Sequence, residues 1–209
     1  MLYHNQFVQT GAVSDIGESL TTNIARSHRL GVELSAGVKV PQWLDLEANA
    51  ALSRNRIKDF TDVVEPYDGD WNDMAPTEVH YANSTLAFSP SAIVNGFADF
   101  HFKGFKATWH TNLGSRQYLD NTACKERSLP KYSQTNVYLS YDLKCGRKGL
   151  KNTVLGVNFN NIFNRHYAAG GWVYSAIVGD DYPQDSRYYQ IGYIPMAGFT
   201  VMGHVTLKF

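Results

Sequence analysis

The chain is organised by a period of two in the placement of apolar and polar residues. Between residues 29 and 40 the even positions, from Leu30 to Val40, are apolar, and the odd positions, from Arg29 to Lys39, are polar or glycine. Such alternation places one set of side chains on each face of a β-strand. The same pattern returns, least regularly in the first of these, in 2–8, 43–54, 92–102, 105–113, 134–143, 152–160 and 197–209. The sequence therefore predicts eight strands.

The connections between these strands fall into two classes. Three connections are short, at 41–42, 103–104 and 144–149. Four are long, polar and aromatic, at about 9–28, 55–85, 118–131 and 171–190. Because short and long connections alternate strictly along the chain, all short turns are expected at one end of an antiparallel sheet and all long loops at the other.

Two architectures produce this alternation: a soluble sheet that packs its apolar face on a core, and a barrel whose apolar face meets lipid. Charged residues on the polar face fit either one. The alternating runs of 11 to 13 residues exceed the roughly 5 or 6 of globular strands and match the roughly 9 to 11 that cross a bilayer at a tilt. Aromatic residues near strand ends suit an interfacial girdle; they are Trp43, Phe102, Phe105, Tyr132 and Phe209. We therefore expect an all-β fold, an antiparallel transmembrane β-barrel segment of about eight long strands with short periplasmic turns and long extracellular loops.

Composition excludes several other classes. The 209 residues hold 19 Lys+Arg and 19 Asp+Glu, so the net charge is zero and nothing in the charge suggests a nucleic-acid partner. An aromatic content of 13% with only 18% charged residues argues against disorder. No apolar run approaches the roughly 20 residues of a transmembrane helix. The first residues, 1–4, lack the pattern of a signal peptide.

Metal, cofactor and catalytic motifs are not recognisable. Cys124 falls in a long loop and Cys145 in a short turn at the opposite end of the strands, so we expect no disulfide between them. The acidic segment 68–73 resembles the start of a calcium loop, but Asp73 stands where glycine is required and Val79 where a bidentate glutamate is needed. We expect no metal site, no cofactor and no catalytic residue.

Several segments together resemble one family. Residues 158–167 with 171–175, and residues 198–209 with their terminal Phe209, are similar to the penultimate and last strands of TonB-dependent outer-membrane receptors. Further stretches resemble the same family in the form found in Bacteroides-type iron and siderophore receptors; they are 3–11, 52–57, 88–90 and 115–122. The resemblance covers essentially the whole chain.

The resemblance implies a transporter of the cell outer membrane, not an enzyme, whose complete form takes up an iron–siderophore or similar ligand. Complete members carry a signal peptide, a TonB box, a plug domain and a barrel of about 22 strands. We therefore expect residues 1–209 to be the C-terminal part of such a barrel, not competent for transport alone. The implied partners are outer-membrane lipid, the missing N-terminal barrel and plug portion, TonB only through that plug, and the barrel-assembly machinery, which would recognise Phe209.

The expected extracellular loops combine aromatic faces with cations, a mixture suited to siderophore complexes through stacking and cation–π contact. The candidate ligand-binding residues are Tyr67, Trp71, Arg116, Tyr118, Arg165, His166, Trp172, Tyr174 and Tyr182, together with Tyr188 and Tyr189. The alternative for each is a structural role in a long loop or a position in the outer aromatic girdle.

Two other interpretations remain open from sequence. The chain could be a complete small eight-stranded outer-membrane barrel with a structural or adhesion role. It could also be a soluble β-sandwich binding module, which would require a second sheet over the apolar face.

Overall fold

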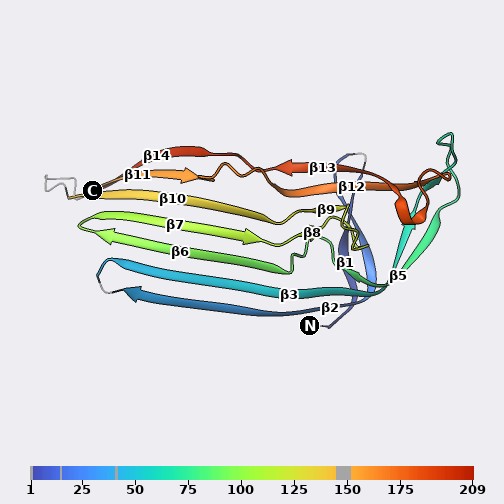
Figure 1. Cartoon of the computed structure of the whole chain (residues 1–209), viewed down its shortest axis with the longest axis horizontal. Coiled ribbons are helices and arrows are strands. Elements are labelled where there is room, and N and C mark those ends of the chain that lie inside the picture. The colour runs from blue at the N-terminus through green and yellow to red at the C-terminus, as the bar shows by residue number, and fades with distance from the viewer. Residues whose placement is uncertain (1, 15, 41, 145–151) are drawn as a thin grey trace.

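The computed structural model of the protein describes residues 2–14, 16–40, 42–144 and 152–209. Its main element is one antiparallel sheet in the order β1–β2–β3–β6–β7–β10–β11–β14 (Figure 1). These strands are β1 (Leu2–Val13), β2 (Ser19–Val40), β3 (Leu44–Val64), β6 (Ala92–Phe102), β7 (Phe105–Gly114), β10 (Tyr132–Leu143), β11 (Asn152–Asn160) and β14 (Thr200–Lys208). All eight strands expected from the alternation are present, which confirms the all-β antiparallel fold. The sheet is open, because β1 and β14 form its two edges and do not pair with each other.

The links between the main strands hold more structure than the sequence predicts. The link 9–28, expected to be a long loop, is mostly strand, because β1 and β2 continue to a turn closed by the Ser14 carbonyl and the Gly17 amide. The other links contain β4 (Pro66–Tyr67), β5 (Thr77–Thr85), β8 (Gln117–Tyr118), β9 (Ser128–Leu129), β12 (Ala168–Val178), β13 (Tyr188–Pro195) and a short 3-10 helix (Gln184–Ser186). β5 pairs with the far part of β3, and β12 and β13 form a hairpin. Most of the short turn expected at 144–149 lies outside the described residues.

A local change of phase explains why alternation hides the far part of β3. Asp59 adopts a positive φ of 58°. Ile57 and Phe60, three residues apart, both belong to one buried cluster and so share a face. In a regular strand only residues an even number apart share a face. The period-two pattern therefore breaks here although the strand continues to Val64.

No helix in the described chain is both long enough and apolar enough to span a membrane.

The main sheet has an apolar face that nothing in the described chain covers. Leu30 and Val32 on this face are 69% and 56% exposed. On the opposite, polar face, carboxamides bridge neighbouring strands: Asn95 Nδ2 donates to Asn49 Oδ1 at 2.9 Å, and Asn112 Nδ2 donates to Asn95 Oδ1 at 2.8 Å. The sandwich interpretation fails for the described residues, because no second sheet covers the apolar face. The closed eight-stranded barrel fails because the edge strands are unpaired.

The buried cores lie at the loop end, where the chain folds back over the polar face. One cluster contains Val8, Ile24, Ile57, Phe60 and Leu86, and a second contains Leu119, Leu129 and Val173. Asn121 joins three segments there, because its Nδ2 donates to the Gln9 carbonyl at 2.8 Å and its Oδ1 accepts from the Ala87 amide at 2.9 Å. The loop after β7 is thus tied to β1, four strands away in the sheet order (Figure 1).

Tyr132 does not belong to an interfacial girdle. It lies opposite Gly114 with its ring over that glycine, where an added Cβ would meet the ring at 2.2 Å. The ring also stacks on Tyr167, with centroids 4.7 Å apart. The same arrangement places His204 over Gly156 and Trp172 over Gly192. Aromatic rings that cover cross-strand glycines are a known means of fixing strand register.

Gly11 provides a test of the contact between β1 and the loop after β7. Its φ is +88°, and a Cβ there would lie 2.0 Å from the Leu119 carbonyl oxygen. Gly17 has a similar φ of +82° but open space around it. We expect G11A to lower the free energy of unfolding by about 1–3 kcal/mol more than G17A, because only G11A adds a steric clash to the backbone strain. Urea denaturation in detergent, followed by tryptophan fluorescence, measures both; equal losses would contradict the contact.

Candidate ligand-binding site

Five aromatic side chains from four separate segments meet at the far loop end. We call Tyr67, Trp71, Tyr174, Tyr182 and Tyr188 the aromatic cluster. The ring centroids of Tyr67 and Trp71 are 5.7 Å apart, those of Trp71 and Tyr188 5.1 Å, and those of Tyr182 and Tyr188 5.5 Å. The Tyr174 hydroxyl donates to the Tyr67 hydroxyl at 3.1 Å. Four of these five are among the main candidates from sequence, and the structure brings them together with Tyr188.

Backbone pairing holds the two halves of the aromatic cluster together. β4 runs parallel to the end of β12, so that Tyr67 lies opposite Val178. The Gly179 amide donates to the Tyr67 carbonyl at 2.9 Å. Gly179 has a φ of +46°, and a Cβ there would lie 3.2 Å from the backbone of Gly69. The turns after β4 and β12 therefore pack backbone against backbone.

The acidic segment 68–73 acts as a turn that presents Trp71. The Asp68 carboxylate accepts from the Asn72 side-chain amide at 2.8 Å and from the backbone amides of Asn72 and Asp70 at 2.8 and 2.9 Å. These bonds, that of the Asn72 side chain first, lower the pKa of Asp68. Trp71 itself has a φ of +64° and is half exposed. The described residues contain no group of three or more acidic, His or Cys side chains arranged to hold a metal ion.

A buried ion pair fixes the segment that carries Tyr188. Arg187 Nη1 donates to Asp62 at 2.7 Å and Arg187 Nη2 to the Tyr81 hydroxyl at 2.8 Å. Only 1% of the Arg187 side chain is exposed. Burial raises the pKa of Asp62, and the hydrogen bond and charge of Arg187 offset part of that rise. Because Arg187 directly precedes Tyr188, the pair positions the aromatic cluster against β3 and β5.

A second buried ion pair shapes the loop between β8 and β9. Arg127 Nε donates to Asp120 at 2.5 Å, and both groups act electrostatically on Asp62.

In the same loop the Cys124 thiol is free and donates to the Glu126 carboxylate at 3.1 Å. Burial raises the pKa of this thiol. The expected lack of a disulfide stays untested, since Cys145 lies outside the described residues.

The other candidates from sequence lie outside the aromatic cluster. Arg116 stabilises the β8–β9 loop, donating to Ser128 Oγ at 2.6 Å and to the Lys125 carbonyl at 3.3 Å. Tyr118 pairs with Ser128 in the same small sheet. The cation of Arg116 is thus bound within its loop.

The candidates near β12 are also separate from one another. Arg165 and His166 are exposed in the turn after β11, where Asn161 holds the backbone of Arg165. Trp172 covers Gly192 within the hairpin, and Tyr189 is exposed on β13. Phe209, at the end of the apolar face of β14, is 77% exposed.

The sequence contains no signal for the contacts of Arg187 with Asp62 and Tyr81, because Arg187 is more than 100 residues from both partners along the chain.

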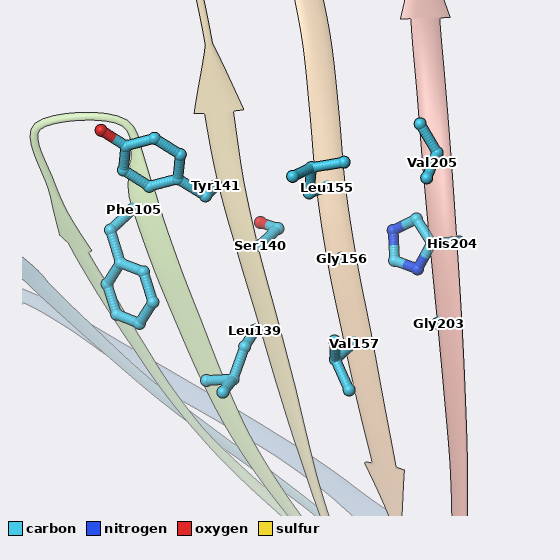
Figure 2. A pocket seen from close by; sticks show the side chains of 10 residues that line it. All are labelled: Phe105, Leu139, Ser140, Tyr141, Leu155, Gly156, Val157, Gly203, His204 and Val205. Carbon is cyan, nitrogen blue, oxygen red and sulfur yellow. The ribbon is translucent and has the colours of Figure 1, made fainter.

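A different hollow, of about 490 Å³, lies across β7, β10, β11 and β14, far from the aromatic cluster (Figure 2). Figure 2 shows mainly aliphatic and aromatic side chains around it, with the His204 ring directed toward Gly156. It is lined by Phe105, Leu139, Ser140, Tyr141, Leu155, Gly156, Val157, Gly203, His204 and Val205. No Asp, Glu, Lys or Arg is among these lining residues. We therefore treat the hollow as part of the sheet surface and not as part of the candidate site.

Comparison with known families decides the class. A family model described as "TonB dependent receptor-like, beta-barrel" matches residues 2–162. The chain belongs to this family. TonB-dependent receptors are transport proteins, typically of the outer membrane, and not enzymes. The family resemblance seen in the sequence is thereby confirmed.

The solved structures agree with a TonB-dependent receptor barrel. The siderophore receptor PiuA from Acinetobacter baumannii superposes with a TM-score of 0.55 at 14% sequence identity, covering 97% of this chain and 24% of that one. At this identity the match shows the fold alone. The chain thus spans about a quarter of the length of that receptor. Neither comparison supports the narrower Bacteroides-type form, and no curated protein sequence matches.

The buried Arg187–Asp62 pair in this receptor barrel can be compared with the exposed Arg26–Asp59 pair, whose carboxylate also lies on β3. R187A leaves the partly buried Asp62 without its cation, and we expect a loss of about 3 kcal/mol in the free energy of unfolding. Arg26 and Asp59 form an exposed pair at 4.0 Å, so R26A should lose less than about 1 kcal/mol. Urea denaturation measures both losses. A loss for R187A no larger than that for R26A would mean that the buried pair does not hold the segment.

Proposed function

We propose that the chain is the C-terminal barrel part of an outer-membrane receptor that imports an iron–siderophore complex or a similar ligand, and that the aromatic cluster contacts this ligand. The observation that carries the proposal is the convergence of Trp71 and Tyr182, both more than 40% exposed, with three further aromatic rings at the loop end. In a TonB-dependent receptor the long loops face the outside, where a ligand first arrives. The siderophore receptor with the same fold supports this ligand class.

The charges around the aromatic cluster restrict the net charge of the proposed ligand. The acidic residues in the segments that build the cluster are Glu65, Asp68, Asp70, Asp73, Asp180 and Asp181. The cations that the sequence suggested, Arg116 and Arg165, lie elsewhere, and Arg187 is buried against Asp62. An acidic rim repels a trianionic ferric tris-catecholate and tolerates a neutral or cationic ferric tris-hydroxamate. The ligand proposed for this site is therefore neutral or cationic, with aromatic stacking or cation–π contact as its main attraction.

In this proposal, transport requires further barrel strands and a plug domain in addition to this chain. The edges β1 and β14 carry unpaired backbone groups, each of which costs several kcal/mol in lipid, so further strands are needed to close the barrel. We propose that an N-terminal barrel and plug portion supplies these strands and that TonB acts only through that plug. We also propose that the barrel-assembly machinery recognises Phe209.

Ligand binding tests the proposal directly. In the receptor that carries this chain, purified in nonionic detergent, W71A/Y182A should raise the Kd for a neutral ferric tris-hydroxamate about tenfold, because two aromatic contacts are lost. Equilibrium dialysis with radioactive iron in the complex measures the Kd. The matched control is Y189A/Y193A, which removes two exposed aromatic residues of β13 outside the aromatic cluster and should change the Kd less than twofold.

Each outcome has a distinct meaning. Tighter binding of the tris-hydroxamate than of a tris-catecholate supports selection of the ligand by the acidic residues around the cluster. The reverse order would overturn this charge argument but not the role of the aromatic cluster. Equal effects of the two double variants would remove the aromatic cluster from the site. Binding of neither complex to the parent receptor would overturn the siderophore proposal.

A further inference from the structure

Basic side chains gather on the outer wall of the sheet where the apolar face of β2 and β3 ends. We call Arg26, His28, Arg54, Arg56 and Lys58 the cationic patch. Arg26 lies directly opposite Lys58, His28 lies opposite Arg56, and Arg54 is one position further along the same face. Residues opposite each other in an antiparallel pair share a face with Cβ atoms about 5 Å apart. The five side chains therefore form one continuous surface across two strands.

The cationic patch continues the apolar face without a gap. Arg54 pairs with Leu30, which is 69% exposed. The next pairs toward the short turn are Val32–Leu52, Leu34–Ala50, Ala36–Ala48, Val38–Leu46 and Val40–Leu44, all apolar. From Leu30 to Val40 the strand rises roughly 34 Å, which a tilt of about 45° reduces to about 24 Å. This is the height of the apolar band of an outer-membrane barrel, so the patch lies at the level of the lipid headgroups.

The cationic patch is poorly neutralised by the protein itself. Directly opposed like charges destabilise a strand pair, and here Arg26 faces Lys58. Asp59 lies 4.0 Å from Arg26, but both side chains are about 60% exposed and such a pair contributes little. Arg56 Nη1 donates to Thr85 Oγ1 at 2.9 Å, a neutral partner. An external anion would remove this repulsion.

The rest of the sheet lacks such a surface. The positions on the apolar face of β6, β7, β10, β11 and β14 carry no Lys, Arg or His within the described bounds of these strands. The basic residues of β7 and β14, such as Lys106 and Lys208, belong to the polar face. In contrast to these five strands, β2 and β3 carry basic residues on the outer wall, and they do so next to β5.

We propose that the cationic patch binds the phosphate groups of lipid headgroups in the leaflet that surrounds the loop end of the barrel. Charge complementarity and the height of the patch, level with the headgroups and directly above the apolar band, select a membrane lipid as the occupant. Clusters of Arg and Lys at this depth attract anionic lipids, and the arginine fork matches phosphate oxygens. Bound lipid would also screen the repulsion between Arg26 and Lys58.

Lipid binding to the receptor that carries this chain tests the proposal. The probe is lipid A with two phosphates, added to the purified protein in nonionic detergent and counted by native mass spectrometry. Each cation near an anionic surface is worth about a factor of five, so R54Q/R56Q/K58Q should weaken binding about 100-fold. The matched control is K39Q/K106Q/K208Q, which removes three cations from the polar face and should change the affinity less than threefold. R54K/R56K keeps the charge and should keep most of the binding.

The opposite results would overturn the proposal. Unchanged binding by R54Q/R56Q/K58Q, or an equal loss in the polar-face control, would mean that the patch holds no lipid. Dephosphorylated lipid A binding as tightly as the phosphorylated form would exclude phosphate as the recognised group. Full displacement of the lipid by an equal concentration of inorganic phosphate would make the site one for free phosphate. Because none of these measurements involves a siderophore, they are independent of the proposed transport function.

Discussion

A strand that crosses hydrocarbon must pair its backbone amides and carbonyls with neighbouring strands, because no water is there to replace them. This requirement accounts for the long ladder of antiparallel pairs from β1 to β14. Contact of the outer face with hydrocarbon accounts for the distribution of side chains. The large aliphatic residues point outward, and the carboxamides of Asn49, Asn95 and Asn112 are linked on the inner, polar face. Within the described chain, only β1 and β14 have an edge that this ladder leaves unpaired.

The loop end is stabilised differently, by small buried cores and by paired charges. There the chain returns over the polar face, and contacts between distant segments replace the regular ladder. Asn121 joins β1 to two loops, and the Arg187–Asp62 pair ties the segment before β13 to β3. These contacts place the aromatic cluster. The candidate ligand site therefore depends on an ordered scaffold of loops and not on any one loop.

Much of the fold could be predicted because alternation is a local property. The eight strands, their order and the short turn at 103–104 follow from residues close together in sequence. The prediction was wrong where alternation breaks, as at Asp59 in β3, and in the link 9–28, whose irregular pattern continues two strands to a tight turn. For the site, the mixture of aromatic and cationic residues in the expected loops pointed to Tyr67, Trp71, Tyr174 and Tyr182. The same criterion also selected Arg116 and Trp172, which lie outside the aromatic cluster.

By itself, the sequence determined which face of each strand is apolar, the ends at which short and long connections lie, and the family. These properties depend on period, length and local motifs, and no distant contact changes them. Only the tertiary structure decided which loop residues meet, because the partners of Arg187 and Tyr174 are more than 100 residues away. It alone also showed the cationic patch, since a register between β2 and β3 is needed to place Arg26 opposite Lys58.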